Sequence, residues 1–273
     1  MAEFSVLISL YYKEKPEYLH EALDSVFKQT ILPNEIVLVK DGPLTAELDA
    51  ILDEYSTRYP IFKFVVNETN LGLGRALAKG IEACTYEYIL RMDTDDIIPS
   101  ERFAKELEAL DKGYDVVSCW SILFENDINN VVAVKTRPEH HDDIVKLAHK
   151  RSPICHPGCA YRKSSVLRAG NYMHNLMYED YDLWVRMIIT GSKFYNIQEV
   201  LYYLRTSMDL VKRRGGFKYA LNEMRNFLRF KELGFYTTKD VIYNSILHSF
   251  VRIVPSFLRH RILKWAWNHK SYQ

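Results

Sequence analysis

Residues 87–96 read EYILRMDTDD, an apolar run that ends in three acidic side chains. The run has the length and composition of a strand that is buried on both faces of a parallel sheet. Similar runs lie at Phe4–Tyr11, Glu35–Val39 and Phe62–Val66. Helical spacing of apolar residues separates them, at Pro16–Gln29, Leu48–Tyr59 and Gly74–Ala83. These strand–helix repeats predict an α/β fold, with a mostly parallel sheet flanked by helices.

The second half of the chain has a mixed pattern of predicted elements. Helices are predicted at Arg102–Leu110, His140–His149 and Tyr181–Ile189, and strands at Val116–Phe124, Val131–Val134 and Gly158–Tyr161. After Tyr202–Leu204 the pattern becomes helical, at Phe217–Leu233, Lys239–Val251 and Ser256–Trp267. We therefore predict a ligand-binding domain over residues 1–204 and a helical C-terminal segment over residues 205–273.

The composition is that of an ordinary globular chain of 273 residues, with 48% hydrophobic and 26% charged residues. The formal net charge of +1 argues against a uniformly basic protein that binds nucleic acid. Residues 205–273 carry 14 basic and 4 acidic side chains, whereas residues 1–204 carry 22 and 31. We expect the acidic part to hold a cation and the basic part to meet phosphates or an anionic membrane.

Apolar runs in the chain fall short of the roughly 18 residues needed to cross a bilayer. No export signal precedes the strand at Phe4. We therefore expect a cytoplasmic protein that can also lie at the inner face of the cell membrane. The cysteines, at positions 84, 119, 155 and 159, form no Cys-x-x-Cys pair, so we expect reduced, buried thiols. No oligomeric state follows from the sequence.

The acidic cluster Asp93-Thr-Asp-Asp96 follows directly after the strand that ends at Met92. Three carboxylates within four residues repel one another unless a cation lies among them. Oxygen ligands of this kind suit Mg²⁺ or Mn²⁺, held together with substrate phosphates. A solvated turn at a helix start is the alternative, since Pro99 and Glu101 follow. The position favours a metal site, because ligands of parallel sheets bind beyond the carboxyl ends of the strands.

Two other loops at strand ends carry polar groups. Asp41, in Val39-Lys-Asp-Gly-Pro43, could accept hydrogen bonds from a base or ribose, although Asp-Gly-Pro is also ordinary turn chemistry. Asn70-Leu-Gly-Leu-Gly-Arg75 opens a helix, and Arg75 could approach a diphosphate or lie on the surface. Leu77 occupies the third glycine position of a dinucleotide fingerprint, so a Rossmann dehydrogenase is disfavoured.

Adjacent carboxylates begin another predicted helix, in Tyr178-Glu-Asp-Tyr-Asp-Leu-Trp184. One of them can face a cleft while the other caps the helix, and aromatic neighbours can raise a carboxylate pKa toward that of a general base. An acidic first turn that complements the helix dipole is the alternative. His156 could line an acceptor cleft, although a structural histidine is the more common case. Lys212-Arg-Arg214 could clamp a diphosphate or belong to the basic surface.

The order of these motifs along one chain resembles glycosyltransferase family 2, the inverting nucleotide-sugar transferases of GT-A fold. The resemblance covers residues 3–205 and rests on Ser5-Val-Leu-Ile-Ser9, Ser25–Gln29-Thr30, Glu35–Val39-Lys-Asp-Gly-Pro43, Asn70-x-Gly72, Asp93-Thr-Asp-Asp96 and Glu179-Asp180-x-x-Leu-Trp184. Bacterial members that build exopolysaccharide, capsule or lipopolysaccharide are the most similar. The resemblance implies a Rossmann-like GT-A sheet with a C-terminal helical extension.

On the donor side, the resemblance implies that Ser9 and Asp41 lie against the nucleoside, with Asp41 near the base. It places Arg75 near the base or the diphosphate. Lys40 departs from the family pattern, which often has the first Asp of an Asp-Asp pair there. The second Asp is kept, so nucleoside binding is still expected.

At the reaction centre, the resemblance implies that Asp93 and Asp95 form the family's Asp-x-Asp motif, touching the ribose and a divalent ion. Asp96 is an alternative ligand for that metal. Asp180 is implied as the catalytic base. The residues implied to contact or orient the acceptor are Glu179, His156 and Trp184.

The activity that the resemblance implies is transfer of a sugar from a nucleotide-diphospho-sugar, expected to be UDP-linked, to an acceptor hydroxyl with inversion. Mn²⁺ or Mg²⁺ would assist, and the acceptor would be a saccharide or a lipid-linked saccharide. The Gln-x-x-Arg-Trp motif of processive synthases is absent, which favours single additions. A catalytically silent nucleotide-sugar-binding protein is one rival. A sugar nucleotidyltransferase is another, but Tyr11-Tyr-Lys-Glu-Lys-Pro16 lacks the glycines usual after its first strand.

The basic C-terminal segment suggests peripheral membrane contact. Its last predicted helix has Phe257, Leu258 and Ile262 toward one side, with Arg259 and Lys264 elsewhere. Such a helix can lie on anionic lipid. Packing of its apolar side on the catalytic domain or in a dimer is an equally supported alternative.

Overall fold

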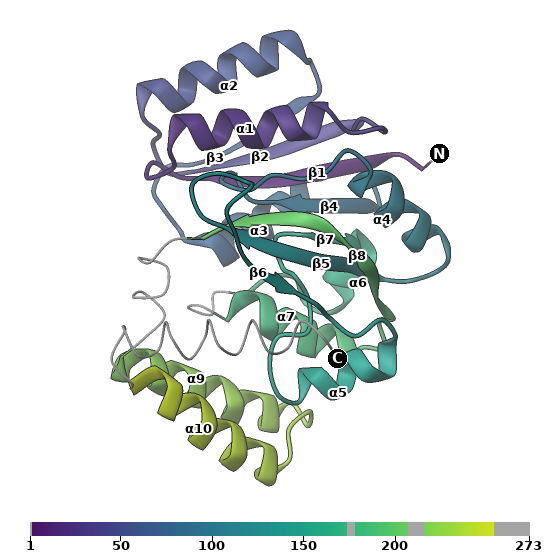
Figure 1. Ribbon diagram of the computed structural model, residues 1–273, viewed down its shortest axis with the longest axis vertical. Helices are drawn as coiled ribbons and strands as arrows, with labels where there is room; N and C mark the ends of the chain where they lie inside the picture. Colours follow the sequence, from purple (N-terminus) through teal and green to yellow (C-terminus); the bar gives the residue numbers. More distant parts are fainter. Residues whose placement is uncertain (1, 174–177, 207–215, 254–273) are drawn as a thin grey trace.

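The computed structural model describes residues 2–173, 178–206 and 216–253 (Figure 1). One sheet runs through it in the order β3-β2-β1-β4-β7-β5-β6, with β8 paired to β5. The strands are β1 (Phe4–Leu10), β2 (Glu35–Asp41), β3 (Phe62–Asn67), β4 (Tyr88–Met92), β5 (Val116–Phe124), β6 (Val131–Lys135), β7 (Cys159–Arg162) and β8 (Phe194–Arg205). The helices are α1 (Pro16–Phe27), α2 (Ala46–Arg58), α3 (Leu73–Ala83), α4 (Arg102–Asp111), α5 (His141–Ala148), α6 (Lys163–Arg168), α7 (Glu179–Ile189), α9 (Phe217–Glu232) and α10 (Thr238–Ile253).

The direction of the strands brings most of their carboxyl ends to one edge of the sheet. β1 is parallel to β2 and β4, and β2 is parallel to β3. β7 is antiparallel to both β4 and β5, so β5 points the same way as β4. β8 is parallel to β5, whereas β6 is antiparallel to it. The predicted α/β fold with a mostly parallel sheet is confirmed.

Side chains along β1 point alternately to the two faces of the sheet, and apolar residues on both faces explain why both carry helices. Phe4, Val6 and Ile8 pack with residues of α1, α2 and α4 on one face, whereas Leu7 packs with residues of α3, α6 and α7 on the other. Figure 1 shows α1 and α2 on one side of the sheet and α7 on the other. A strand buried on both faces needs apolar residues in both alternating sets, as the apolar run at Phe4–Tyr11 provides.

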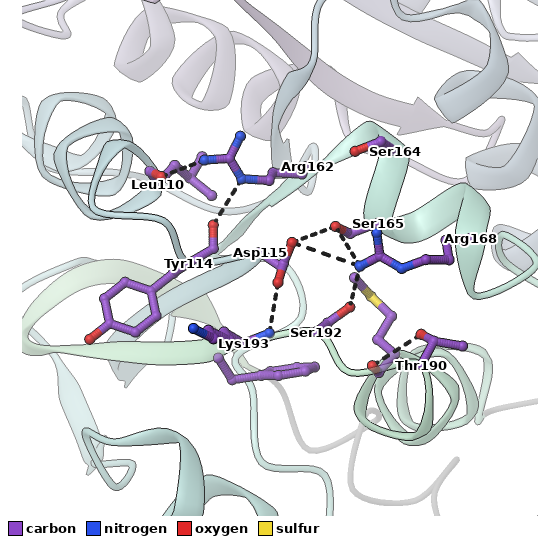
Figure 2. A network of polar contacts seen from close by, with 12 residues as sticks. Leu110, Tyr114, Asp115, Arg162, Ser164, Ser165, Arg168, Thr190, Ser192 and Lys193 are labelled. Atoms are coloured by element: carbon purple, nitrogen blue, oxygen red, sulfur yellow. Dashed lines mark hydrogen bonds and ion pairs between the residues drawn. The ribbon is translucent and has the colours of Figure 1, made fainter.

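Asp115 locks the amino ends of β5 and β8 together (Figure 2). One of its carboxylate oxygens accepts a hydrogen bond from Ser165 Oγ at 2.5 Å, and the other accepts from the Lys193 amide at 2.8 Å. Nearby, Arg162 donates to the carbonyl of Leu110 at 2.8 Å. Because Asp115 precedes β5 and Lys193 precedes β8, the network fixes the start of this parallel pair. The opposite, carboxyl ends of the two strands are thereby positioned for the site described below.

Two elements of the described chain were not predicted from the sequence. α6 is a single short helix after β7, too short for a periodic pattern to be visible. β8 was not predicted, and its register against β5 shifts between Ile197 and Val200. Gln198 and Glu199 fall at that irregularity and interrupt the apolar pattern. The predicted helix Ser256–Trp267 and the segment Lys212-Arg-Arg214 lie outside the described residues.

The C-terminal helices α9 and α10 pack side by side (Figure 1). A cluster of mostly aromatic side chains packs them against the start of α7. Its buried members are Tyr178, Tyr181, Val185, Tyr219, Phe227, Phe230 and Tyr236. The predicted C-terminal helical extension is therefore present as far as residue 253. The predicted boundary after residue 204 falls one residue before the end of β8. All four cysteines are buried, as predicted.

Glu223 of α9 connects these helices to the start of α7. Its carboxylate accepts hydrogen bonds from Arg252 Nε and Nη2, both at 2.9 Å, and from the Tyr178 hydroxyl. His248 Nδ1 lies 3.2 Å from the same carboxylate. Burial by itself would raise the pKa of Glu223, but the hydrogen bonds from His248 and Arg252 and the charge of Arg252 lower it to about 2.

Within the described residues, none of the helices is both long and apolar enough to span a membrane.

We predict that Glu223 makes stability sensitive to acid. Its pKa is lower in the folded chain than the ordinary 4.5, so its contribution is full above about pH 4.5 and is lost as pH falls toward 2. The shift corresponds to about 3 kcal/mol at neutral pH. Urea unfolding of the wild type and of Glu223→Gln between pH 7 and about 3.5 measures it. At pH 7 the free energy of unfolding of Glu223→Gln should be lower than that of the wild type, and the difference should decrease as the pH falls.

The control is Glu232→Gln, a change of an exposed acid on the same helix, whose free energy of unfolding should follow that of the wild type. A difference between Glu223→Gln and the wild type that stays constant with pH would contradict the assignment.

Candidate active site

A cavity of about 560 Å³ opens at the carboxyl ends of β4, β5 and β8. Its lining combines side chains from parts of the chain that are distant in sequence. They are the acidic turn after β4, the ends of β5, β6 and β8, residues 151–157, the starts of α3 and α7, and α9 with α10. Ligands of parallel sheets bind at this edge, so the cavity is the candidate site.

The acidic turn predicted from the sequence lines this cavity with all three carboxylates. One oxygen from each of Asp93, Asp95 and Asp96 lies within 4.8 Å of the others. Burial raises the pKa of Asp95 to about 7, with further contributions from the charges of Asp93 and Glu14. Burial and the two neighbouring aspartates raise the pKa of Asp96 well above its ordinary value. The turn therefore concentrates negative charge that a cation would relieve.

Two arginines hold the acidic turn in place. Arg91 is 1% exposed in β4 and its Nη2 pairs with Asp93, while its Nε and Nη1 are buried without a hydrogen-bond partner among the described residues. Arg205 ends β8, and its backbone amide donates to Asp96 Oδ1 at 2.7 Å. The Arg205 Nε donates to the carbonyl of Asp95 at 2.9 Å. Among these contacts only Asp93 pairs with a guanidinium. Most of the negative charge of the turn is therefore not neutralised by the two arginines.

The donor set of the turn fits a hard divalent cation. Three carboxylate oxygens gathered at a cavity are the ligand type that Mg²⁺ and Mn²⁺ prefer over softer metals. One oxygen of Asp96 is engaged by the Arg205 amide, which orients that carboxylate without neutralising it. Asp95 and Asp96 would hold the cation, and Asp93 would stay tied to Arg91.

Asp180 lies on the same cavity although it is far from the acidic turn in sequence. It sits in the first turn of α7, half-buried, and its Oδ2 accepts a hydrogen bond from Ser152 Oγ at 3.3 Å. Glu179 lines the cavity beside it. The structure therefore brings together the two acidic motifs that the sequence singled out, which is the arrangement their interpretation requires.

Gly74 explains why the glycines of the Asn70–Arg75 loop are needed. A Cβ at Gly74 would come 2.8 Å from the Met173 carbonyl and 3.1 Å from Glu179 Cβ. Gly72, the N-cap of α3, has a φ of +85°, a backbone region that L-residues rarely adopt. Gly74 thus allows α3 to approach the start of α7 closely, and Gly72 allows the positive φ at the N-cap of α3.

His156 lines the cavity, and Trp184 does not. A ring nitrogen of His156 lies 2.9 Å from the Tyr172 hydroxyl. Burial and the charge of Arg91 lower the pKa of His156 well below its ordinary value, so the ring is neutral. Trp184 is fully buried behind it, with ring centroids 5.9 Å apart. A role of Trp184 toward an acceptor would therefore have to act through His156.

The three other residues predicted to bind the donor do not line this cavity. Asp41 is buried, and its carboxylate accepts hydrogen bonds from the amides of Leu71 at 2.9 Å and Gly72 at 3.0 Å. It thereby organises the loop before α3. Ser9 lies half-buried near the end of β1, and Arg75 is exposed on α3. Their predicted contacts with a nucleoside stay predictions.

Several cavity residues were missed from the sequence. Arg91 carried a signal, because a charge inside an apolar strand needs a buried partner, and Asp93 follows two residues later. No local signal marked the others, which the fold brings in from distant segments. They are Lys135, Arg137, Arg151, Arg205, Glu223, His248 and Arg252.

Residues 5–170 match the family model described as glycosyl transferase family 2. The UDP-Gal:alpha-D-GlcNAc-diphosphoundecaprenol beta-1,3-galactosyltransferase of Escherichia coli is 37% identical over 264 residues, which are 96% of this chain and 95% of that protein. The amylovoran biosynthesis glycosyltransferase AmsE of Erwinia amylovora is 38% identical, with 92% and 94% covered.

Solved structures of low sequence identity share the fold. The mannosyltransferase PcManGT of Pyrobaculum calidifontis, solved with GDP-Man and Mn²⁺, superposes with a TM-score of 0.66 at 17% identity, covering 91% of this chain and 69% of that one. The S. aureus TarS 1–349 structure with UDP-GlcNAc gives a TM-score of 0.60 at 20% identity, with 75% and 59% covered. These likenesses support the fold, a GT-A-type α/β sheet, and nothing more.

We predict that the acidic turn binds Mn²⁺ in the absence of any other ligand. Asp95→Asn combined with Asp96→Asn removes two ligands and also relieves the repulsion in the turn. Mn²⁺ should therefore raise the thermal unfolding midpoint of the wild type and leave that of the double variant unchanged. The matched control is Asp142→Asn with Asp143→Asn, two exposed acids in the first turn of α5. Equal stabilisation of all three proteins by Mn²⁺ would show that the ion binds elsewhere.

Proposed function

Because the chain belongs to glycosyltransferase family 2 and is a glycosyltransferase of the kind used in bacterial polysaccharide synthesis, we propose that it moves a hexose from a UDP-sugar to a lipid-linked saccharide. The reaction is proposed to invert the anomeric configuration and to need Mn²⁺ or Mg²⁺. The Escherichia coli relative, which matches almost end to end, supports both the UDP-linked donor and the diphosphate-linked lipid acceptor.

One observation carries the proposal: Asp93, Asp95, Asp96 and Asp180 share one cavity. An inverting transfer needs a cationic site for the leaving diphosphate and a base for the acceptor on opposite sides of the sugar. The acidic turn would supply the first with a cation held by Asp95 and Asp96, and Asp180 at the start of α7 would supply the second. A silent binding protein would have no use for a base in the same cavity as the acidic turn.

The proposed step is a single displacement. Asp180 takes the proton of an acceptor hydroxyl, and that oxygen forms a bond to the anomeric carbon. The bond from that carbon to the diphosphate oxygen breaks on the opposite face, and the nucleoside diphosphate leaves with the electron pair. Ser152 donates to Asp180 and so orients its carboxylate. A bound divalent ion would supply charge stabilisation for the leaving diphosphate.

Residues 152–157, with the neutral His156 among them, form the cavity wall beside Asp180. An imidazole whose pKa is lowered well below its ordinary value offers hydrogen bonds without charge. We assign this wall, together with Glu179, to the acceptor sugar. Asp41, Arg75 and Ser9 remain assigned to the donor nucleoside, with the loop that Asp41 organises lying near the base.

The proposed base is tested with Asp180→Asn. The amide keeps the size and hydrogen-bonding reach of the carboxylate but does not accept the proton, so transfer should fall by at least about 10²-fold. Binding of UDP in the presence of Mn²⁺, followed by calorimetry, should stay within about twofold of the wild type. UDP-galactose is the first donor to test, with slow hydrolysis as a second readout of activity. Asp142→Asn serves as the control, and full turnover by Asp180→Asn would reject the assignment.

We also propose that the C-terminal helices contact the membrane that carries the lipid acceptor. α9 and α10 each expose an apolar stripe at helical spacing. The larger exposed side chains are Phe217, Leu221, Met224 and Leu228 of α9, and Ile242, Ile246 and Phe250 of α10. Ile246 is 68% and Phe250 67% exposed. The excess of basic residues in this segment complements an anionic bilayer surface.

Vesicle sedimentation tests this contact. The wild type should sediment at low salt with vesicles that contain phosphatidylglycerol, and far less with vesicles of phosphatidylcholine alone. Ile246→Asp combined with Phe250→Asp should stay in the supernatant, because both charges would have to enter the interface. Val66→Asp, a change of an exposed apolar side chain on β3, should sediment like the wild type. A wild type that stays in the supernatant with anionic vesicles would end the proposal.

A further inference from the structure

The cations that line the active-site cavity differ in what they pair with. Arg91 pairs with Asp93, Arg205 with Glu21, and Arg252 with Glu223. Each of these guanidiniums is thereby occupied by the protein itself. Their charges serve mainly to hold the fold around the site.

Arg137 and Arg151 are different. Both line the cavity, and across residues 2–173, 178–206 and 216–253 neither has a carboxylate within ion-pair distance. Arg137 Nη1 donates to the Thr136 carbonyl at 2.9 Å, and its Nε is buried with no hydrogen-bond partner in that part of the chain. Lys135, at the end of β6, lines the cavity beside them. Arg137 is half-buried and Arg151 is exposed, and a buried donor such as Arg137 Nε is costly unless a ligand completes it.

The two arginines also repel each other. Burial and the charge of Arg151 lower the pKa of Arg137 to about 10, and burial lowers the pKa of Arg151. Two like charges brought together from the end of β6 and from the loop after α5 gain nothing from each other. An anion between them would satisfy both and use the forked donors of each guanidinium.

The location of the pair indicates which anion is involved. Arg151 adjoins Ser152, which donates to Asp180, so the pair lies on the side of the proposed base. The acidic turn and its cation are the site proposed for the donor's diphosphate. A second anion beside the base would belong to the molecule that presents its hydroxyl to Asp180.

We infer that Arg137 and Arg151 form an anion subsite for the diphosphate that joins the acceptor sugar to its lipid. The inference rests on the proposed function and adds to it the residues that would make the enzyme require a diphosphate-linked acceptor. The chemistry of the subsite is that of a phosphate or diphosphate ester. The donor also carries such a group, so the test separates the two sources.

The test compares two synthetic acceptors that carry the same sugar and the same alkyl chain. One is joined through a diphosphate and the other directly. For Arg137→Gln and Arg151→Gln we expect the KM of the diphosphate acceptor to rise by roughly 10- to 100-fold, the loss of one or two charge-assisted hydrogen bonds. The KM of the UDP-sugar, and turnover with the directly joined acceptor, should change by less than about twofold.

Controls keep the outcomes distinct. Lys150→Gln, an exposed cation next to Arg151 that does not line the cavity, should behave as the wild type, and Arg137→Lys should retain part of the effect. Equal losses with both acceptors would overturn the subsite, and a rise in the donor KM alone would assign the pair to the donor diphosphate instead.

A binding measurement needs no turnover. Pyrophosphate titrated into the metal-free protein should bind the wild type and Asp180→Asn alike, and should bind the double variant Arg137→Gln/Arg151→Gln at least about tenfold more weakly. Equal binding to the double variant would overturn the subsite. A wild type that binds pyrophosphate as expected but transfers sugar to neither acceptor from any UDP-sugar would refute the proposed function and leave the anion site standing.

Discussion

Electrostatic repulsion within the turn after β4 is the constraint on which the site depends. Three carboxylates lie within 4.8 Å of one another, and burial makes their ionisation costlier still. The fold tolerates this because Arg91 and Arg205 fix the turn from two sides, one from inside the sheet and one from the end of β8. The turn therefore costs stability locally, a common compromise at functional sites, and a bound cation would restore part of that stability.

The C-terminal helices belong to the site and are more than an appendage to it. Glu223 accepts a hydrogen bond from the hydroxyl of Tyr178, which immediately precedes Glu179 and Asp180. The position of the proposed base therefore depends on α9. Asp182 in the same turn of α7 is buried between Arg186 and Arg229, at 2.8 and 2.6 Å. Two buried acids therefore tie the first turn of α7 to α9. The polar contacts continue the aromatic packing between these helices.

The sequence predicts well what depends on local pattern. The strands β1–β5 and the helices between them follow from apolar runs and apolar periodicity, which are local properties of the sequence. The acidic turn and the Glu179–Asp180 pair were visible as motifs at element ends, and a family resemblance supplied their roles. Trp184 shows the limit of that transfer, since it lies in the core behind His156. The carboxylate of Asp41 is engaged by the loop that follows β3, and its contact with a nucleoside stays a prediction.

What the sequence could not predict depends on which segments the fold brings together. Arg137 and Arg151 look like ordinary surface cations in the chain, and only the folded structure shows that both line the cavity. β8 was hidden because an irregularity against β5 breaks its alternation. Glu223 and Arg252 are far apart in sequence and are paired only by the packing of α9 on α10. Each of these depends on a non-local contact, which no local pattern of side chains encodes.

The family match ends at residue 170, yet one wall of the cavity comes from Tyr219, Glu223, His248 and Arg252. The part of the chain that matches the family model and this wall of the cavity are therefore encoded in separate stretches, and Asp180 lies beyond the matched part. An exchange of α9 and α10 with a related protein would keep the site intact only if the partner of Tyr178 were kept. A chimera that swaps α9 and α10 without residues 178–182 would break the contact that orients the proposed base. We therefore expect differences in acceptor between relatives to involve residues 178–182 together with α9 and α10.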